Sequence, residues 1–143
     1  MIFFNNEKVY YNRFNFLISD YDYHITHINK EKGLFYSEII LEKENTSKIR
    51  IVIERGCLEL DLYVEDVPIG IDLIYKFLHH DEIVKSSIFG NSTYIKKYFE
   101  ITVRKYLDEI LPICSTLKAK DIDEFYHEFP FYVFKWSWFI TYI

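Results

Sequence analysis

The segment from Lys48 to Val64 reads KIRIVIERGCLELDLYV, and its alternation of apolar and polar side chains decides the fold. If Arg55-Gly56 forms a tight turn, the isoleucines of the first half face the leucines of the second half. The facing pairs are Ile53 with Leu58, Ile51 with Leu60, and Ile49 with Leu62. A shift of one residue would bury the charged side chains instead, so this register is favoured. We therefore predict a β-hairpin with one apolar face.

The same register extends to the strands that precede the hairpin. With a turn over residues 44–46, a strand from about Leu34 to Lys43 adds the apolar pairs Leu41 with Ile49 and Ile39 with Ile51, and the charged pair Glu42 with Lys48. A further strand, about Tyr23 to Ile28, leads into the turn NKEKG at residues 29–33. Because each strand satisfies the same alternation, we expect an antiparallel meander of four strands.

Apolar residues at helical spacing lie before and after this meander. The predicted helices are about Glu7 to Ser19, a short helix to about Leu78, the longest from about Ser92 to Leu111, and another short one near Asp121. Short polar side chains that can cap the first turns support these starts. The expected caps are Asn5 or Asn6, then Asp66 with Pro68 in the first turn, and finally Asp121 in a capping box with Glu124.

The C-terminal segment PFYVFKWSWFITYI, residues 130–143, is unusually aromatic. Read as a strand, it places six large side chains on one face: Tyr132, Phe134, Trp136, Trp138, Ile140 and Tyr142. A helix is the alternative, and the segment is too short to cross a bilayer. We expect a buried or half-buried strand that would add to the same sheet.

Together these patterns predict a single α+β domain spanning residues 1–143. An N-terminal helix precedes the four-stranded meander, and a mainly helical C-terminal half packs on the sheet. Half of the 143 residues are hydrophobic, which is enough for a packed core. No signal peptide is visible at the N-terminus and no apolar run is long enough for a membrane helix, so we expect a cytoplasmic protein without membrane contact.

The net charge of −5 bears on the choice of partner. Nucleic acid is not expected, because binding to phosphates requires a basic surface and the chain has no long run of Lys or Arg. A basic protein is easier to accommodate, since opposite charge speeds encounter and helps to fix the orientation of a complex.

Residues that could perform chemistry are present but are not arranged in a known signature. His24 and His27 are expected to point to opposite faces of a strand, so a shared metal is not predicted. The run HHDE at residues 79–82 carries ligand atoms, yet no further metal-binding spacing supports it. Gly-rich phosphate loops and nucleophile elbows are absent, and Cys57 and Cys114 have no histidine next to them in sequence. We predict a protein without catalytic activity, metal or cofactor.

Acidic and aromatic side chains gather on the polar face of the predicted sheet. On the expected register this face carries Tyr36, Glu38, Glu59, Asp61, Tyr63 and Glu65, with Arg50 opposite Asp61. The face either contacts a protein partner or is solvent-exposed exterior. We take these six residues as the candidate partner-binding site, because aromatic side chains supply anchoring area in interfaces.

The block FNFLISDYDYHI, followed by LFYSEIILE and KIRIVIERGCLELDLYV, covers about the first half of the chain. This order of segments resembles small immunity proteins of bacterial polymorphic toxin systems and related uncharacterised bacterial domains. The resemblance implies an acidic cytoplasmic protein that binds one cognate toxin and neutralises it by occluding its active site, without chemistry of its own.

Two other functions fit the same sequence. A phage or mobile-element inhibitor of a host defence enzyme would have nearly the same physical properties, and the neighbouring gene would distinguish the two. A small enzyme or ligand-binding domain could use an aromatic pocket formed with the C-terminal segment. That segment could also form a homodimer interface.

Overall fold

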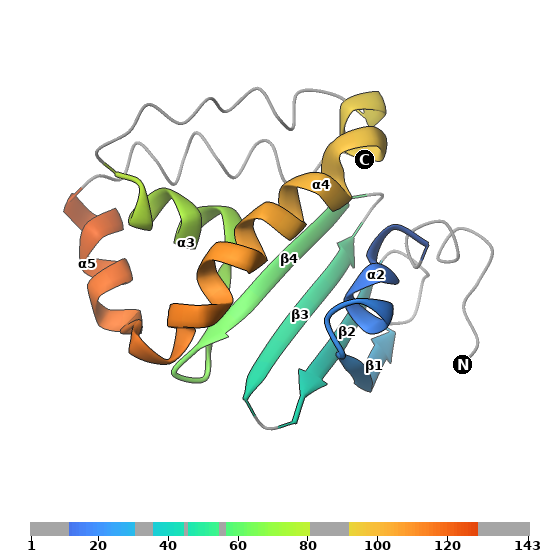
Figure 1. Ribbon diagram of the computed structural model, residues 1–143, viewed down its shortest axis with the longest axis horizontal. Coiled ribbons are helices and arrows are strands. Elements are labelled where there is room, and N and C mark those ends of the chain that lie inside the picture. The colour runs from blue at the N-terminus through green and yellow to red at the C-terminus, as the bar shows by residue number, and fades with distance from the viewer. Residues whose placement is uncertain (1–11, 31–35, 45, 55–56, 81–91, 129–143) are drawn as a thin grey trace.

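The computed structural model describes residues 12–30, 36–44, 46–54, 57–80 and 92–128 (Figure 1). For Lys30, Glu54, Cys57 and residues 92–98 only the backbone is described. The predicted tail, residues 130–143, lies outside these ranges, as do Asn5, Asn6 and the first residues of the predicted N-terminal helix.

The described part is an α+β structure around one antiparallel sheet in the order β1-β2-β3-β4-β5. The strands are β1 (His24–Lys30), β2 (Tyr36–Lys43), β3 (Ser47–Glu54), β4 (Cys57–Val64) and β5 (Val67–Gly70). The helical elements are α2 (Phe16–Ser19), α3 (Ile71–Leu78), α4 (Ser92–Ile110), the 3-10 segment η2 (Leu111–Thr116) and α5 (Ala119–Glu128). The first four strands form the predicted meander.

The predicted register of the central strands is confirmed. The pairs between β3 and β4 include Ile49 with Leu62, Ile51 with Leu60 and Ile53 with Leu58, and Arg50 lies opposite Asp61. The pairs between β2 and β3 include Leu41 with Ile49, Ile39 with Ile51 and Glu42 with Lys48. Because side chains alternate with a period of two, one correct pair fixes all the remaining pairs between the same two strands when no bulge interrupts them.

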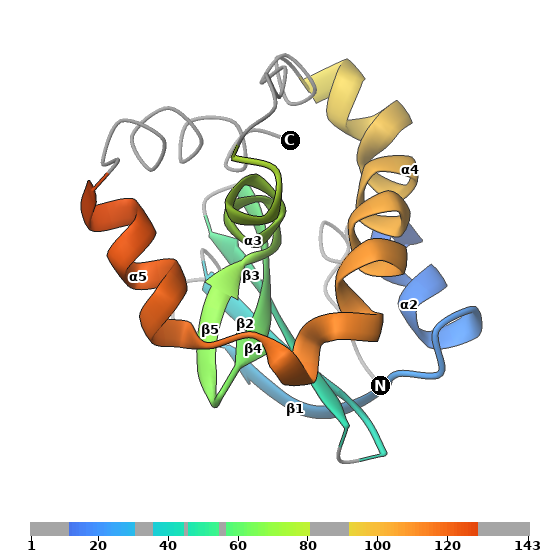
Figure 2. The same cartoon turned by 60° about the vertical axis from the view of Figure 1, so that its left-hand side comes forward.

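The apolar face of this sheet forms the core together with the helices. In Figure 2, α2 and α4 lie on one side of the sheet. Helix α3 lies between α4 and α5, and α5 lies near β5. The buried residues that join sheet and helices include Phe14, Leu17, Leu41, Ile49, Ile51, Leu62, Ile74, Phe99, Val103, Tyr106, Leu107 and Ile110. On α4, the buried stripe that faces the sheet includes Phe99, Val103, Tyr106 and Ile110.

The sheet has a fifth strand where a helix start was predicted. Asp66 does not cap a helix: Glu65 and Asp66 have φ angles of 52° and 66° and form the turn between β4 and β5. Two consecutive left-handed residues are typical of the tight turn that reverses a hairpin. The chain therefore pairs Val67–Gly70 with β4 before α3 begins at Ile71.

The start of α5 also differs from the prediction. The helix begins at Ala119, and the carbonyl of Lys118 accepts the backbone N–H groups of Asp121 and Ile122. Asp121 thus lies in the first turn and does not act as the cap. The first N–H group, that of Ala119, is instead bound by the side chain of Glu65, at 2.8 Å from Oε1.

A bulge in β1 overturns the prediction for its two histidines. His24 lies opposite Glu42 and His27 opposite Ile40, with an irregularity between Ile25 and His27. The extra residue shifts the alternation by one. His24 and His27 consequently share one face of the sheet, and do not point to opposite faces.

Candidate functional site

The outer face of the sheet is the face opposite the core, on which Arg50 and Asp61 lie. Five of the six predicted site residues occupy it, namely Tyr36, Glu38, Glu59, Asp61 and Tyr63. The register therefore brings these five side chains together as expected. Their environments differ from the expected exposed acidic surface in three respects.

First, Asp61 is held in an internal ion pair. The Arg50 Nε and Nη2 atoms donate to Asp61 Oδ2 at 2.9 and 2.6 Å, and Asp61 is only 1% exposed. Arg50 Nη1 lies 3.9 Å from Glu38 Oε2. Burial alone would lower the pKa of Arg50, but the hydrogen bond and charge of Asp61 raise it above its usual value. Asp61 thus fixes the register of β3 and β4 and is not accessible to a partner.

Second, the outer face is only partly polar. Ile40 and Val52 lie on it, and both are buried. Tyr36 is half-buried and its hydroxyl donates to Glu38 Oε2 at 3.2 Å. The middle of this face is thus not a solvated acidic surface.

Third, Glu65 does not belong to the outer face. It lies in the turn after β4, and its carboxylate accepts the Ala119 N–H and lies 3.8 Å from Lys118 Nζ. A carboxylate at a helix N-terminus satisfies a free N–H group and interacts favourably with the helix dipole. Glu65 therefore ties the β4–β5 turn to α5.

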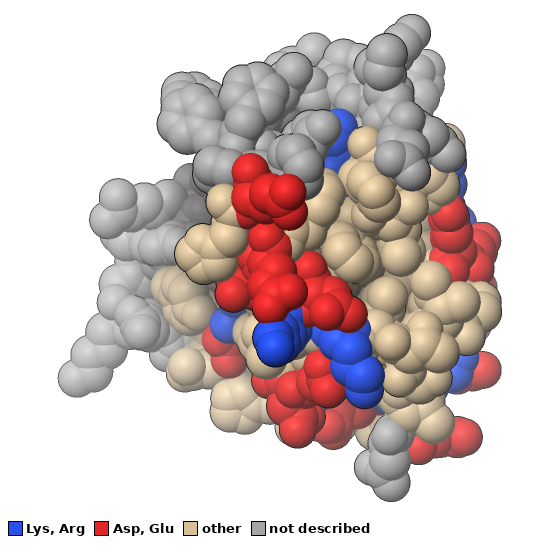
Figure 3. Space-filling view, turned by 90° about the vertical axis from the view of Figure 1, so that its left-hand side faces the viewer, with Lys and Arg blue, Asp and Glu red and all other residues tan. Residues whose placement is uncertain are grey.

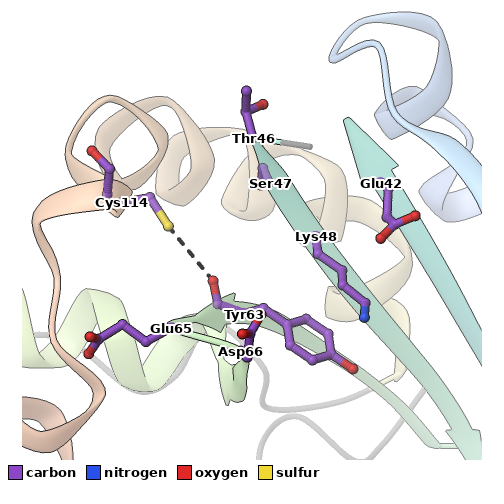
Figure 4. Close-up of a pocket in the computed structure, with 9 residues that line it drawn as sticks. Glu42, Thr46, Ser47, Lys48, Tyr63, Glu65, Asp66 and Cys114 are labelled. Atoms are coloured by element: carbon purple, nitrogen blue, oxygen red, sulfur yellow. Dashed lines mark hydrogen bonds between the residues drawn. The ribbon is translucent and has the colours of Figure 1, made fainter. Parts of the chain in front are cut away.

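A hollow of about 340 Å³ lies at the end of the sheet that carries this turn (Figure 4). Figure 4 shows Lys48 reaching towards the ring of Tyr63, and the ammonium lies 4.6 Å from the ring centroid. Glu65 points away from Tyr63, and Cys114 Sγ lies 3.9 Å from the Tyr63 carbonyl oxygen. Burial raises the pKa of the Cys114 thiol, so this thiol is poorly suited to act as a nucleophile.

A second hollow, about 380 Å³, lies between the outer face, β5 and α5; we call it the α5 hollow. Its apolar lining includes Val67, Ile69, Leu73 and Ile122, and its charged lining is Arg50, Glu59, Asp61 and Asp123. The Tyr126 hydroxyl donates to the Leu73 carbonyl, which holds α5 against α3. Two predicted site residues, Glu59 and Asp61, thus line this hollow.

Asp72 is buried close to the α5 hollow. It is 2% exposed, and within the described part of the chain no side chain donates a hydrogen bond to its carboxyl group; the donors close to it are the backbone N–H groups of Leu73 and of Asp72 itself. Burial raises the pKa of Asp72 to about 8. The backbone N–H groups of Leu73 and Asp72 lower this pKa, and the negative charges of Glu59 and Asp61 raise it further. At neutral pH Asp72 is therefore mostly an uncharged carboxylic acid, which sequence analysis did not single out.

An exposed acidic surface surrounds α5. We define the acidic band as Glu65 and Asp66 of the β4–β5 turn together with Asp121, Asp123, Glu124 and Glu128 of α5; all six are exposed. Figure 3 shows Asp and Glu side chains gathered on the side of the molecule that carries α5, with Lys or Arg side chains among them. The basic residues in these segments are Lys118 and Lys120, so carboxylates outnumber lysines.

Sequence analysis missed the α5 part of the acidic band. The segment AKDIDEFYHE places Ile122 and Tyr126 on one side of a helix, and both are buried. The carboxylates fall on the opposite side, as in an amphipathic surface helix. Asp121 and Glu124 also match the spacing of a capping box, and that pattern describes the start of a helix and not its exposed face.

The side chains of His79 and His80 contact neighbouring residues of the fold. The His79 ring stacks on Tyr75 with centroids 4.3 Å apart, and its Nε2 lies against the carboxylate of Glu109. His80 Nδ1 lies 3.0 Å from the Phe77 carbonyl oxygen. The remaining residues of the HHDE run, Asp81 and Glu82, lie outside the described ranges. Within those ranges, no three His, Cys, Asp or Glu residues are grouped so that they could hold a metal ion.

Comparison with known proteins does not add a relative. No family model, curated protein or solved structure matched this chain. Among the helices that the structure describes, none has the length and apolar character needed to cross a membrane.

Proposed function

We propose that this protein is a non-enzymatic binding protein whose acidic band engages a basic protein partner, and that it acts as an immunity protein by covering the active site of a bacterial toxin. The acidic band is the observation that carries the proposal. Toxins that act on nucleic acids or nucleotides need a basic cleft for phosphate, and an acidic surface can compete for that cleft.

The placement of the acidic band supports this function. Its carboxylates are presented by a helix and a tight turn that are linked through Glu65 and Ala119. A charged surface on a rigid support loses little conformational entropy when it binds, which favours affinity. The α5 hollow lies beside the band, so charge and shape are available to the same partner.

The first experiment is co-expression with the product of the adjacent gene, followed by affinity capture and an assay of the captured protein's toxicity. We expect a basic protein that is inhibited when bound, with affinity that falls as the salt concentration rises, because exposed charges are screened. Failure to capture a basic protein, or a complex that is insensitive to salt, would contradict the proposal.

Matched charge reversals locate the interface. Glu124→Lys with Glu128→Lys changes two exposed positions of the acidic band and breaks the exposed Glu124–Lys120 pair at 3.8 Å. The control is Glu44→Lys with Glu100→Lys, which changes two exposed positions outside the band and breaks the exposed Glu100–Arg104 pair at 3.6 Å. Both variants change net charge equally.

The outcome of this comparison is specific. We expect the α5 variant to bind the captured partner about tenfold or more weakly than the control, mainly through slower association. Equal affinities for the two variants would place the interface elsewhere and reject the acidic band as its site.

A further inference from the structure

The α5 hollow has a mainly apolar wall. Three elements form this wall, with Val67, Pro68 and Ile69 from β5, Leu73 from α3, and Ala119 and Ile122 from α5. Its volume of about 380 Å³ falls within the range of roughly 300–1,000 Å³ that is typical of small-molecule pockets. The hollow is thus large enough for one large side chain of a partner.

Val67 is the most accessible part of this wall. It is 45% exposed, and within the described part of the chain only Ile101 and Ile113 are large apolar residues that are exposed as well. A single exposed apolar residue is ordinary on a protein surface. Val67 differs because Ile69 and Leu73 continue its apolar surface into a concave site. Apolar surface in such a site is a favourable place to bury part of a ligand.

The charged side chains of the lining already have partners. Arg50 donates two hydrogen bonds to Asp61 Oδ2, at 2.9 and 2.6 Å. Asp123 Oδ2 lies 3.8 Å from His127 Nε2, and Glu59 also interacts within the chain. The lining therefore does not require an ion to balance it, and a ligand gains mainly from the apolar wall.

Two planar groups in the lining favour an aromatic ligand. The Arg50 guanidinium binds Asp61 through its N–H edge, so this pair does not use the faces of the guanidinium. Such faces stack on aromatic rings, and Tyr126 adds a ring of its own to the lining. Rings also pack on one another in offset or edge-to-face arrangements. An aromatic side chain therefore fits this hollow better than an aliphatic one.

The acidic band borders the hollow. Glu65 and Asp66 directly precede Val67, and Asp123 belongs both to the band and to the lining. Protein interfaces commonly combine an apolar centre, often with an aromatic anchor, and a polar rim. A basic partner that lies on the band would thus bring its own apolar residues to the hollow.

We infer that the α5 hollow receives one aromatic side chain of the basic partner, which packs on Val67, Leu73 and the Arg50 guanidinium while neighbouring Lys or Arg side chains of the partner lie on the acidic band. This inference rests on the proposed function, because it names the residue type that anchors the same partner. The hollow itself can be tested on the protein alone.

The test uses three tripeptides with blocked termini as probes: Lys-Trp-Lys, Lys-Ala-Lys and Glu-Trp-Glu. Each is titrated into the isotopically labelled full-length protein at pH 7, and backbone amide shifts are followed by NMR. We expect saturable shifts at Ile69, Gly70 and Leu73 with Lys-Trp-Lys, at a dissociation constant on the order of millimolar. Lys-Ala-Lys should bind about tenfold or more weakly because it lacks the ring. Glu-Trp-Glu should bind about fivefold or more weakly because the acidic band repels its charges.

Two exposed apolar residues provide matched variants. Val67→Ser removes apolar surface from the wall, whereas Ile113→Ser removes it from η2, outside the hollow. The two residues are 45% and 37% exposed, so both variants should fold, and circular dichroism checks this. Val67→Ser should weaken Lys-Trp-Lys binding about threefold or more, and Ile113→Ser should leave it unchanged.

Four results would overturn the inference: no saturable shift at these amides, equal binding of Lys-Ala-Lys, equal binding of Glu-Trp-Glu, or equal binding of Lys-Trp-Lys by the two variants. None of them alters the capture of a basic partner or the effect of the variants at Glu124 and Glu128, which test the proposed function. Failure of this inference is therefore distinguishable from failure of the proposed function.

Discussion

Replacing Asp72 by Asn should stabilise the protein at neutral pH, and the gain should depend on pH. Burial raises the pKa of Asp72 from 3.8 to about 8. The groups that face it are Glu59 and Asp61 on β4 and the phenol of Tyr106 on α4, whose own pKa is raised by burial and by Asp72. None of these neighbours supplies a positive charge that would favour the ionised form.

The sign and size of this change in stability follow from proton linkage. Above pH 3.8 the unfolded chain ionises Asp72, while the folded protein keeps it protonated until about pH 8. Unfolding therefore releases a proton in this interval, and the free energy of unfolding falls as pH rises, by at most about 1.4 kcal/mol per pH unit. The full interval from pH 3.8 to about pH 8 corresponds to roughly 6 kcal/mol, which is an upper bound because relaxation of the site reduces it.

Asn is close in shape to Asp and stays neutral at every pH. The Asp72→Asn variant therefore removes only the pH-dependent contribution of this residue to the free energy of unfolding. Urea unfolding of wild type and Asp72→Asn, followed by circular dichroism from pH 4 to 8.5, gives the difference in unfolding free energy at each pH. We expect a difference near zero at pH 4 that grows to about 2–4 kcal/mol in favour of the variant at pH 7 and levels off above pH 8. Titration of other groups cancels in this difference.

A difference for Asp72→Asn that is constant from pH 4 to 8.5 would refute the reasoning, because Asp72 would then have the same pKa in the folded and unfolded chain. A wild type that becomes relatively more stable as pH rises would refute it more strongly, since the sign would be reversed.

Two further predictions concern the contacts around the acidic band. Arg50→Ala should lower the free energy of unfolding by about 2–4 kcal/mol, because it leaves the buried Asp61 without its partner. The double variant Arg50→Met with Asp61→Leu should recover most of that loss. Equal urea midpoints for the wild type, Arg50→Ala and the double variant would contradict the role of the pair. Glu65→Ala should cost about 0.5–2 kcal/mol, the usual value of a lost helix cap, and should speed hydrogen exchange at the first turn of α5. Faster exchange throughout β4 instead would show that Glu65 supports the sheet and not the helix.

The central strands could be predicted from sequence because two constraints act on each residue. Ile51, for example, must face both Ile39 and Leu60, and both pairs are observed. The prediction was wrong where the backbone departs from regular alternation. The bulge after Ile25 reversed the expected side of His27, and the Glu65-Asp66 turn carries no glycine or asparagine to announce left-handed geometry.

The candidate site was harder to predict because exposure depends on tertiary contacts. Alternation correctly placed Glu59 and Asp61 on one face, but it could not show that Arg50 would bury Asp61. Nor could it show that Glu65 would turn towards Ala119, which is 54 residues away along the chain. The helical spacing of the α5 residues predicts an acidic side of this helix. The position of that side next to the β4–β5 turn is known only from the three-dimensional structure.

The two outermost described strands limit how this sheet can be extended. β1 carries the bulge between Ile25 and His27, and β5 has only four residues, one of which is Pro68 without an N–H group. Irregular, short and proline-containing edges resist the addition of a further strand. Backbone pairing with another chain is thus disfavoured at both edges, which discourages self-assembly into fibres. For the proposed partner, these edges favour recognition through side chains, and such recognition can be altered by surface substitutions that leave the sheet intact.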